Sequence, residues 1–190
     1  MAISSRLKGY LESLKIRYTT ATHPTAYTAQ EIAAALHVPG RQLAKSVLVK
    51  TAAGPTLAVL PAAQLIDVKK LKALLRATSL SIGKESDIKA LFPDVEVGAM
   101  SPFGNLYQVP VIVDRLLESQ EQITFNAGSH TQTVTMAFKD FAAAAKPKLG
   151  EFALAPAKPK KTAAKKRKAS TPSNKRTARK PARTAKPKRR

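Results

Sequence analysis

The chain has 190 residues, enough for one domain of ordinary size with its own core. It contains no cysteine, which excludes disulfides, thiolate nucleophiles and cysteine-ligated metals and fits a reducing compartment. The formal charge of +21 is uneven, because the chain from Lys146 onward holds 18 Lys and Arg against one acid, Glu151, whereas residues 1–145 hold 15 Lys and Arg and 11 Asp and Glu. The composition therefore predicts a nearly balanced globular part followed by a strongly basic tail.

The globular part alternates irregularly between patterns typical of helices and of strands. We expect helices that follow Ser4 or Ser5, span 28–36, 67–75 and 86–92, and begin again near Phe138, and strands at 17–21, 41–50, 56–60, 79–82, 109–114, 122–125 and 131–136. The strands 41–50 and 56–60 flank a turn and form a predicted hairpin. Pro110 places its strand near a sheet edge or at a strand end. These elements predict a mixed α/β or α+β fold.

Capping signals and apolar spacing support the helices. Thr28 and Glu31 match a capping box, and Asp67 can cap the helix that follows it. The residues expected on buried helix faces are Leu7, Tyr10, Leu11, Leu14, Ile32, Ala35, Leu36, Val68, Leu71, Leu74 and Leu75. Between the elements, 96–104 is expected to be a loop rich in glycine and proline, and 126–130 a turn between two strands.

The C-terminal composition differs from the rest of the chain. After Leu154 no Leu, Ile, Val or aromatic residue occurs, so this segment cannot bury enough apolar surface to offset its ordering entropy. We expect a folded domain over residues 1–146 and a disordered Lys/Arg/Ala/Pro-rich tail over 147–190. Such a polycation binds nucleic acid nonspecifically through counterion release, and without aromatic side chains it does not read sequence.

No segment of the sequence predicts a membrane association. The N-terminal residues form no long apolar run, so they do not predict a signal peptide. No stretch approaches the ~20 apolar residues that a membrane helix needs. The sequence therefore predicts a soluble cytoplasmic protein, and it carries no signal for an oligomeric state.

Lys45 lies at an unusual position in its predicted strand. The period of two places it on one face with Val47 and Val49. Because desolvating an ammonium is costly, the group should lose its proton or meet an anion. We expect that anion to belong to a substrate. The alternative is that Lys45 sits at the strand end and extends its head into water.

Familiar catalytic signatures are absent from the sequence. It has no Walker loop, no dinucleotide fingerprint, no nucleophile elbow and no zinc-protease motif. The three histidines, His23, His37 and His130, are scattered without metal-ligand spacing. We therefore expect neither a metal nor an organic cofactor.

Five segments together resemble one family. They are Thr-Ala-Gln-Glu-Ile at 28–32, Leu-Ala-Lys-Ser-Val at 43–47, Leu-Ala-Val-Leu-Pro at 57–61, Val-Gly-Ala-Met-Ser-Pro at 97–102 and Phe-Asn-Ala-Gly-Ser-His at 125–130. In order and spacing they resemble the YbaK-like family, which includes the editing domain of bacterial prolyl-tRNA synthetases and free-standing aminoacyl-tRNA deacylases. The resemblance covers about residues 5–146. It implies a mixed, mostly antiparallel curved sheet flanked by helices.

The resemblance also implies an activity. The family hydrolyses the ester that joins a wrong amino acid to the 3′ end of tRNA, most commonly proline-accepting tRNA. Lys45 corresponds to the family's essential lysine, which positions the tRNA 3′ end, and Gly98 to Pro102 corresponds to the loop beside the ester. An ester needs only a placed water and donors for the developing oxyanion, and the terminal ribose offers its own hydroxyl. No side-chain triad is then required.

The remaining candidate residues are expected to contact the substrate. Those expected to line or border the pocket are Met100, Ser101, Phe103, Asn126, Gly128, Ser129, His130 and His23. For Asn126, Gly128 and His130 a role in the turn is an equal alternative, because Asn-Ala-Gly-Ser is good turn chemistry. The amino acid removed stays open among alanine, cysteine, serine and threonine.

Two other functions are compatible with the sequence. One is a catalytically inactive nucleic-acid-binding protein that acts through its basic tail. The other is a small-molecule acyl hydrolase that uses the same pocket.

Overall fold

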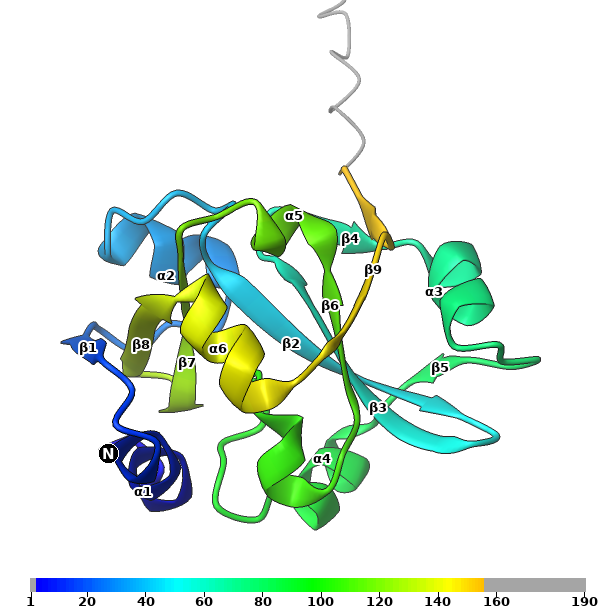
Figure 1. Ribbon diagram of the computed structural model, residues 1–190, viewed down its shortest axis with the longest axis horizontal. Coiled ribbons are helices and arrows are strands. Elements are labelled where there is room, and N and C mark those ends of the chain that lie inside the picture. The colour runs from blue at the N-terminus through cyan, green and yellow to red at the C-terminus, as the bar shows by residue number, and fades with distance from the viewer. Residues whose placement is uncertain (1–2, 156–190) are drawn as a thin grey trace, which may run out of the picture. The chain divides into compact units, whose positions relative to one another are not determined.

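The computed structural model describes residues 3–155 (Figure 1). The helices are α1 (Ser5–Ser13), α2 (Ala29–Ala35), α3 (Val68–Leu74), α4 (Glu85–Leu91), α5 (Arg115–Glu118) and α6 (Phe138–Ala145), with one 3-10 turn, η1 (Gly104–Tyr107). The strands are β1 (Tyr18–Thr22), β2 (Ala44–Thr51), β3 (Gly54–Pro61), β4 (Leu65–Ile66), β5 (Ser81–Ile82), β6 (Val111–Asp114), β7 (Gln122–Ser129), β8 (Gln132–Ala137), β9 (Lys148–Gly150) and β10 (Ala153–Leu154). Over this range no helix is long and apolar enough to cross a membrane.

The strands form a mixed set of sheets. A five-stranded sheet has the order β5-β2-β3-β6-β9, in which β2 is antiparallel to β3 and β5, while β6 is parallel to β3 and β9. A three-stranded antiparallel sheet has the order β1-β8-β7, and β4 pairs with β10. A bridge between Leu43 and Thr124 brings the start of β2 beside β7. The predicted mixed, mostly antiparallel fold with flanking helices is confirmed.

The two faces of β2 contact different parts of the core. Ala44 and Leu48 belong to the larger apolar cluster, whereas Val49, with Val47 beside it, belongs to a second cluster under α3. Lys45 shares the face of Val47 and Val49 by strand alternation. The side chain of Lys45 therefore leaves the strand on its buried face, so the amine at its end must find polar partners or reach solvent.

The predicted helix starts are confirmed. Thr28 Oγ1 accepts from Glu31 N at 3.2 Å, and Glu31 Oε2 accepts from Thr28 N at 3.1 Å, which completes the capping box of α2. Asp67 Oδ1 accepts from two amides in the first turn of α3. The β2–β3 hairpin also forms as predicted.

Three residues expected on buried helix faces are exposed. Leu14 is 47% exposed because it is the C-cap of α1, beyond the turn that buries Leu7 and Leu11. Ala35 ends the seven-residue α2 and is exposed, and Val68, the first residue of α3, is exposed as well.

One strand prediction is confirmed in one of its two alternatives and another needs correction. Pro110 directly precedes β6, as expected for a proline at a strand end, whereas β6 itself is not an edge strand, since it lies between β3 and β9; Pro110 O accepts from Leu57 N at 2.8 Å. The segment expected as a turn at 126–130 is largely strand, because β7 continues to Ser129 with a register shift after Asn126. Gly128, with φ +103°, accommodates this irregularity.

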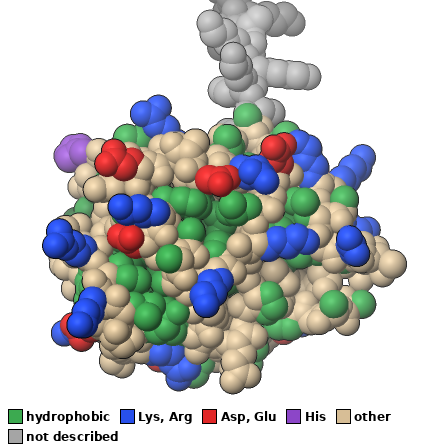
Figure 2. Space-filling view, in the orientation of Figure 1, with side chains coloured by type: hydrophobic (Ala, Val, Ile, Leu, Met, Phe, Trp, Pro, Cys, Tyr) green, Lys and Arg blue, Asp and Glu red, His purple; other side chains and the backbone are tan. Residues whose placement is uncertain are grey.

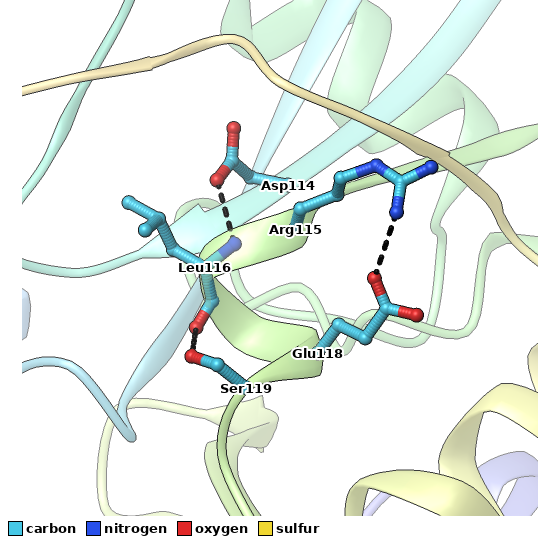
Figure 3. A network of polar contacts seen from close by, with 5 residues as sticks. All are labelled: Asp114, Arg115, Leu116, Glu118 and Ser119. Carbon is cyan, nitrogen blue, oxygen red and sulfur yellow. Dashed lines mark hydrogen bonds and ion pairs between the residues drawn. The ribbon is translucent and has the colours of Figure 1, made fainter.

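The folded part extends beyond the boundary expected at Lys146. β9 adds to the main sheet, β10 pairs with β4, and Phe152 between them is fully buried. Asp114, itself buried, accepts from Phe152 N and Ala153 N at 2.6 Å each. Figure 3 shows that its other oxygen accepts from Leu116 N at the start of α5. Residues 156–190, which include most of the predicted disordered tail, lie outside the described part.

Candidate functional site

A cavity of about 170 Å³ lies between α2, the start of β2, the loop before η1 and β7. Its lining residues are Tyr27, Ile32, Leu43, Ala44, Lys45, Ser46, Gly98, Met100 and Asn126. The surface has larger hollows elsewhere, such as one of about 370 Å³ beside Phe138. The smaller cavity is the candidate site because it combines a half-buried lysine with a glycine loop.

The amine of Lys45 is held by two backbone carbonyls. Lys45 Nζ donates to Gln64 O at 2.6 Å and to Ala62 O at 3.3 Å. Both acceptors follow directly from β3, the hairpin partner of β2, so the hairpin itself positions the amine. Partial burial lowers the pKa of Lys45 from its ordinary value. Since an ammonium has three N–H donors, one donor remains for a ligand in the cavity.

The loop that carries Gly98 is fixed by His130. Gly98 has φ +89°, and a Cβ at this position would lie 3.4 Å from His130 Cε1. The ring of His130 is buried between two carbonyls, with Nε2 2.8 Å from Val97 O and Nδ1 3.2 Å from Ala26 O. Its backbone N–H donates to Glu96 Oε2 at 2.8 Å. His130 thus joins the glycine loop to the segment before α2.

The cavity also contains polar groups that lack protein partners. Ser46 Oγ and Asn126 Oδ1 are buried and, among residues 3–155, neither has a hydrogen-bond partner. In the same range no backbone carbonyl accepts from the N–H of Gly98 or Met100. Because buried polar groups are normally satisfied, Ser46 Oγ and Asn126 Oδ1 mark a place where a polar ligand or water belongs.

Four of the residues predicted for the site line this cavity together: Lys45, Gly98, Met100 and Asn126. The ring of His130 packs next to Gly98, with its Cε1 3.4 Å from where a Cβ on Gly98 would lie.

The other predicted site residues do not line the cavity. Pro102 and Ser101 are buried in the loop, and Phe103 packs edge-on against Phe125 and Phe141 in the core.

Of the remaining three, Gly128 and Ser129 end β7, and His23 follows β1. A Cβ on Gly128 would lie 3.1 Å from Ser4 Cβ, so Gly128 allows the start of α1 to pack closely. Ser129 Oγ is 3.4 Å from Thr131 Oγ1. His23 is buried and its Nδ1 lies 2.8 Å from Pro24 O.

Sequence reasoning missed several residues of the cavity wall. Ser46 follows Lys45 and points to the opposite face of β2, so period-two analysis separates the two residues. Both nevertheless border the cavity, because it lies at the beginning of the strand. Tyr27 could have been found as the residue before the capping box, but that signal predicts a helix start and not a site.

Comparisons with known proteins agree on one family. The family described as "Aminoacyl-tRNA editing domain" matches residues 23–144. The chain is 28% identical over 136 residues to the prolyl-tRNA editing protein ProX of Acetoanaerobium sticklandii, a match that covers 68% of this chain and 82% of that protein. It is 32% identical over 98 residues to the proline–tRNA ligase of Fervidobacterium nodosum, covering 52% of this chain but 17% of the ligase.

Solved structures share the fold. A candidate trans-editing enzyme for prolyl-tRNA synthetase superposes with a TM-score of 0.72 at 18% identity, covering 81% of this chain and 98% of that one. The hypothetical protein APE2540 superposes with a TM-score of 0.73 at 16% identity, covering 79% of this chain and all of that one. At these identities the likeness concerns the fold alone.

Proposed function

The chain belongs to the YbaK-like family of aminoacyl-tRNA editing domains, and we propose that it is a trans-editing hydrolase that cleaves the ester of misacylated tRNA, in particular of proline-accepting tRNA. The observation that carries this proposal is the amine of Lys45, held by Gln64 O and Ala62 O beside the Gly98 loop with one donor to spare. The name of the ProX relative supports the choice of tRNA.

Lys45 would position the substrate through its charge. Its remaining N–H can donate to a phosphate or nearby backbone oxygen of the tRNA 3′ end. A hydrogen bond to a charged group contributes about 1.5–3 kcal/mol. The anion expected to pair with the Lys45 ammonium would then belong to the nucleic acid. Lys45 would bind the substrate and would not attack the ester.

The Gly98 to Pro102 loop would receive the ester. Glycine allows backbone N–H groups to approach the carbonyl closely, and the N–H groups of Gly98 and Met100 are available for the developing oxyanion. A water adds to the carbonyl carbon, the bond from that carbon to the ribose oxygen breaks, and the ribose oxygen takes up a proton that the water releases. The neighbouring ribose hydroxyl can orient the water, so no side-chain base is needed.

The cavity wall favours a small amino acid. Ile32, Leu43 and Met100 supply apolar surface around a volume of about 170 Å³. Alanine, cysteine, serine and threonine remain candidates, because one methylene changes binding by only about 1–3 kcal/mol. Asn126 would contact the substrate from β7. Ser101, Phe103, Gly128, Ser129, His130 and His23 would support the site from behind the wall.

The basic segment would hold tRNA near the cavity. Residues 156–190 contain 16 Lys and Arg and no Asp or Glu. On the folded part, by contrast, Figure 2 shows Lys and Arg scattered over one face with Asp and Glu among them. Leu154 pairs with Leu65, the residue after Gln64, so the chain leaves the described part close to the carbonyl that holds Lys45. Counterion release would then concentrate tRNA where the ester is cleaved.

A deacylation panel tests the proposal. The full chain is incubated with proline tRNA charged with alanine, cysteine, serine, threonine or proline, and the release of amino acid is followed. Lys45→Ala should lower kcat/KM roughly 10- to 150-fold. The matched control is Lys50→Ala on the same strand, whose amine pairs with Asp87 at the surface. Full activity in Lys45→Ala, or no hydrolysis of any charged tRNA by the wild type, would reject the proposed mechanism.

The basic composition of residues 156–190 supports a second candidate, an inactive nucleic-acid-binding protein. This candidate would be favoured if the full chain bound duplex DNA tightly and released no amino acid from any tRNA. A chain that ends at residue 155 separates the two functions, because it should keep deacylation with a higher KM under the first proposal.

A further inference from the structure

Tyr27 is an exposed aromatic side chain at the candidate site. It is 75% exposed, whereas the other large apolar side chains that are exposed in residues 3–155 range from 44% to 54%. It nevertheless lines the cavity together with Lys45 and Gly98. Exposure of a large ring to water is unfavourable, and this ring borders the candidate site. We therefore expect a bound ligand to cover it.

The ring of Tyr27 is supported from one side. Its centroid lies 4.8 Å from that of the His130 ring, at an interplanar angle of 54°. His130 is buried and both of its ring nitrogens face carbonyl oxygens, so its ring is a rigid support for the ring of Tyr27. The high exposure of Tyr27 shows that the rest of its surface is open to solvent.

The backbone of Tyr27 is also fixed. Its N–H donates to Glu31 Oε2 at 3.0 Å, and the preceding Ala26 N donates to His130 O at 3.1 Å. The carboxylate that caps α2 therefore holds Tyr27 as well as Thr28. An aromatic ring with few free torsions on a fixed backbone loses little entropy when another ring stacks on it.

We propose that Tyr27 stacks on the terminal nucleobase of the RNA whose ester is cleaved in the cavity. This inference rests on the proposed function. In an aminoacyl ester the base and the ester are attached to the same ribose. When the ester carbonyl lies at the Gly98 loop, the base lies within one sugar of it, and Tyr27 lines the same cavity as Gly98. Stacking accepts any base, so Tyr27 supplies affinity for a nucleotide end and no sequence reading.

The expected effect falls on binding and not on chemistry. Loss of one base–aromatic stack weakens binding about 5- to 150-fold. Because the base does not change during hydrolysis, this loss should raise KM and leave kcat nearly unchanged. A residue that positioned the water would change kcat instead.

The test compares Tyr27→Leu with Tyr27→Phe in the full chain. Leucine keeps an apolar side chain without a stacking face, whereas phenylalanine keeps the face and removes the hydroxyl. The first readout is KM and kcat for mischarged proline tRNA. The second uses uncharged tRNA with 2-aminopurine as the terminal base, whose fluorescence is quenched by stacking. Ile82→Ala, at an exposed position on β5, is the control for a general effect of surface truncation.

We expect wild type, Tyr27→Phe and Ile82→Ala to quench the fluorescence and to share one KM, and Tyr27→Leu to lose the quenching and to raise KM. Equal quenching and equal KM in Tyr27→Leu and wild type would overturn the inference. If the wild type released no amino acid but quenched in a Tyr27-dependent way, stacking would stand and the hydrolytic function would fail. The two failures are therefore distinguishable.

Discussion

Removal of the last two strands should severely destabilise the domain, although they contain only five residues. A chain that ends at residue 146 lacks β9, β10 and Phe152, whereas a chain that ends at residue 155 keeps all three. We expect the longer truncation product to be as stable as the full chain and the shorter one to be severely destabilised. The comparison isolates residues 147–155 from the basic segment that follows them.

The magnitude follows from Phe152 and Asp114. Loss of a fully buried phenylalanine costs about 3–5 kcal/mol. Asp114 loses its hydrogen bonds from Phe152 N and Ala153 N, and bonds to a charged group contribute about 1.5–3 kcal/mol each. Water that reaches the uncovered carboxylate recovers part of the second contribution. A loss of at least about 4 kcal/mol is therefore expected, a large share of the 5–15 kcal/mol typical of a domain.

Urea denaturation followed by circular dichroism measures this difference. With a slope of about 2 kcal/mol/M, the midpoint of the 1–146 chain should fall at least about 2 M below that of the 1–155 chain. Asp114→Asn in the full chain, with Glu118→Gln as the exposed control in the same network, tests the hydrogen-bond contribution alone (Figure 3). Midpoints within about 0.5 M of each other for the two truncated chains would refute the reasoning.

Three further results are expected. Gly98→Ala should lower stability by about 1–3 kcal/mol and reduce deacylation, because alanine is strained at φ +89°; an unchanged urea midpoint and rate would contradict this. The pKa of Glu31 is lowered because its carboxylate accepts from the amides of Thr28 and Tyr27, so its contribution is present above the ordinary carboxyl range and is lost as pH falls through the lowered pKa. The midpoints of wild type and Glu31→Gln should therefore differ at neutral pH and converge in acid, and a constant difference would oppose that assignment. Finally, KM for charged tRNA should rise steeply with salt in the full chain and only weakly in the 1–155 chain, and parallel slopes would exclude a role for the basic segment.

The sequence by itself determined the features that depend on neighbours along the chain. The capping box of Thr28 and Glu31, the Asp67 cap and the β2–β3 hairpin each involve groups a few residues apart, so residue types at fixed spacing suffice to predict them. The sequence also determined the strand face on which the side chain of Lys45 lies, because side chains alternate between faces from one residue to the next. The composition likewise separated a balanced domain from a basic segment.

Tertiary structure decided which of these features meet. The carbonyls of Ala62 and Gln64 accept from Lys45 only because the hairpin folds back. The ring of Tyr27 packs against His130, whose ring nitrogens face Ala26 O and Val97 O and so bring the segment before α2 beside the Gly98 loop. β9 and β10 are three and two residues long and carry no periodicity that sequence analysis could detect. β9 pairs with β6, and the buried Asp114, more than thirty residues away, accepts from the amides of Phe152, between the two strands, and of Ala153 in β10. A long-range contact of this kind depends on geometry that the whole fold supplies, and for that reason no local pattern predicts it.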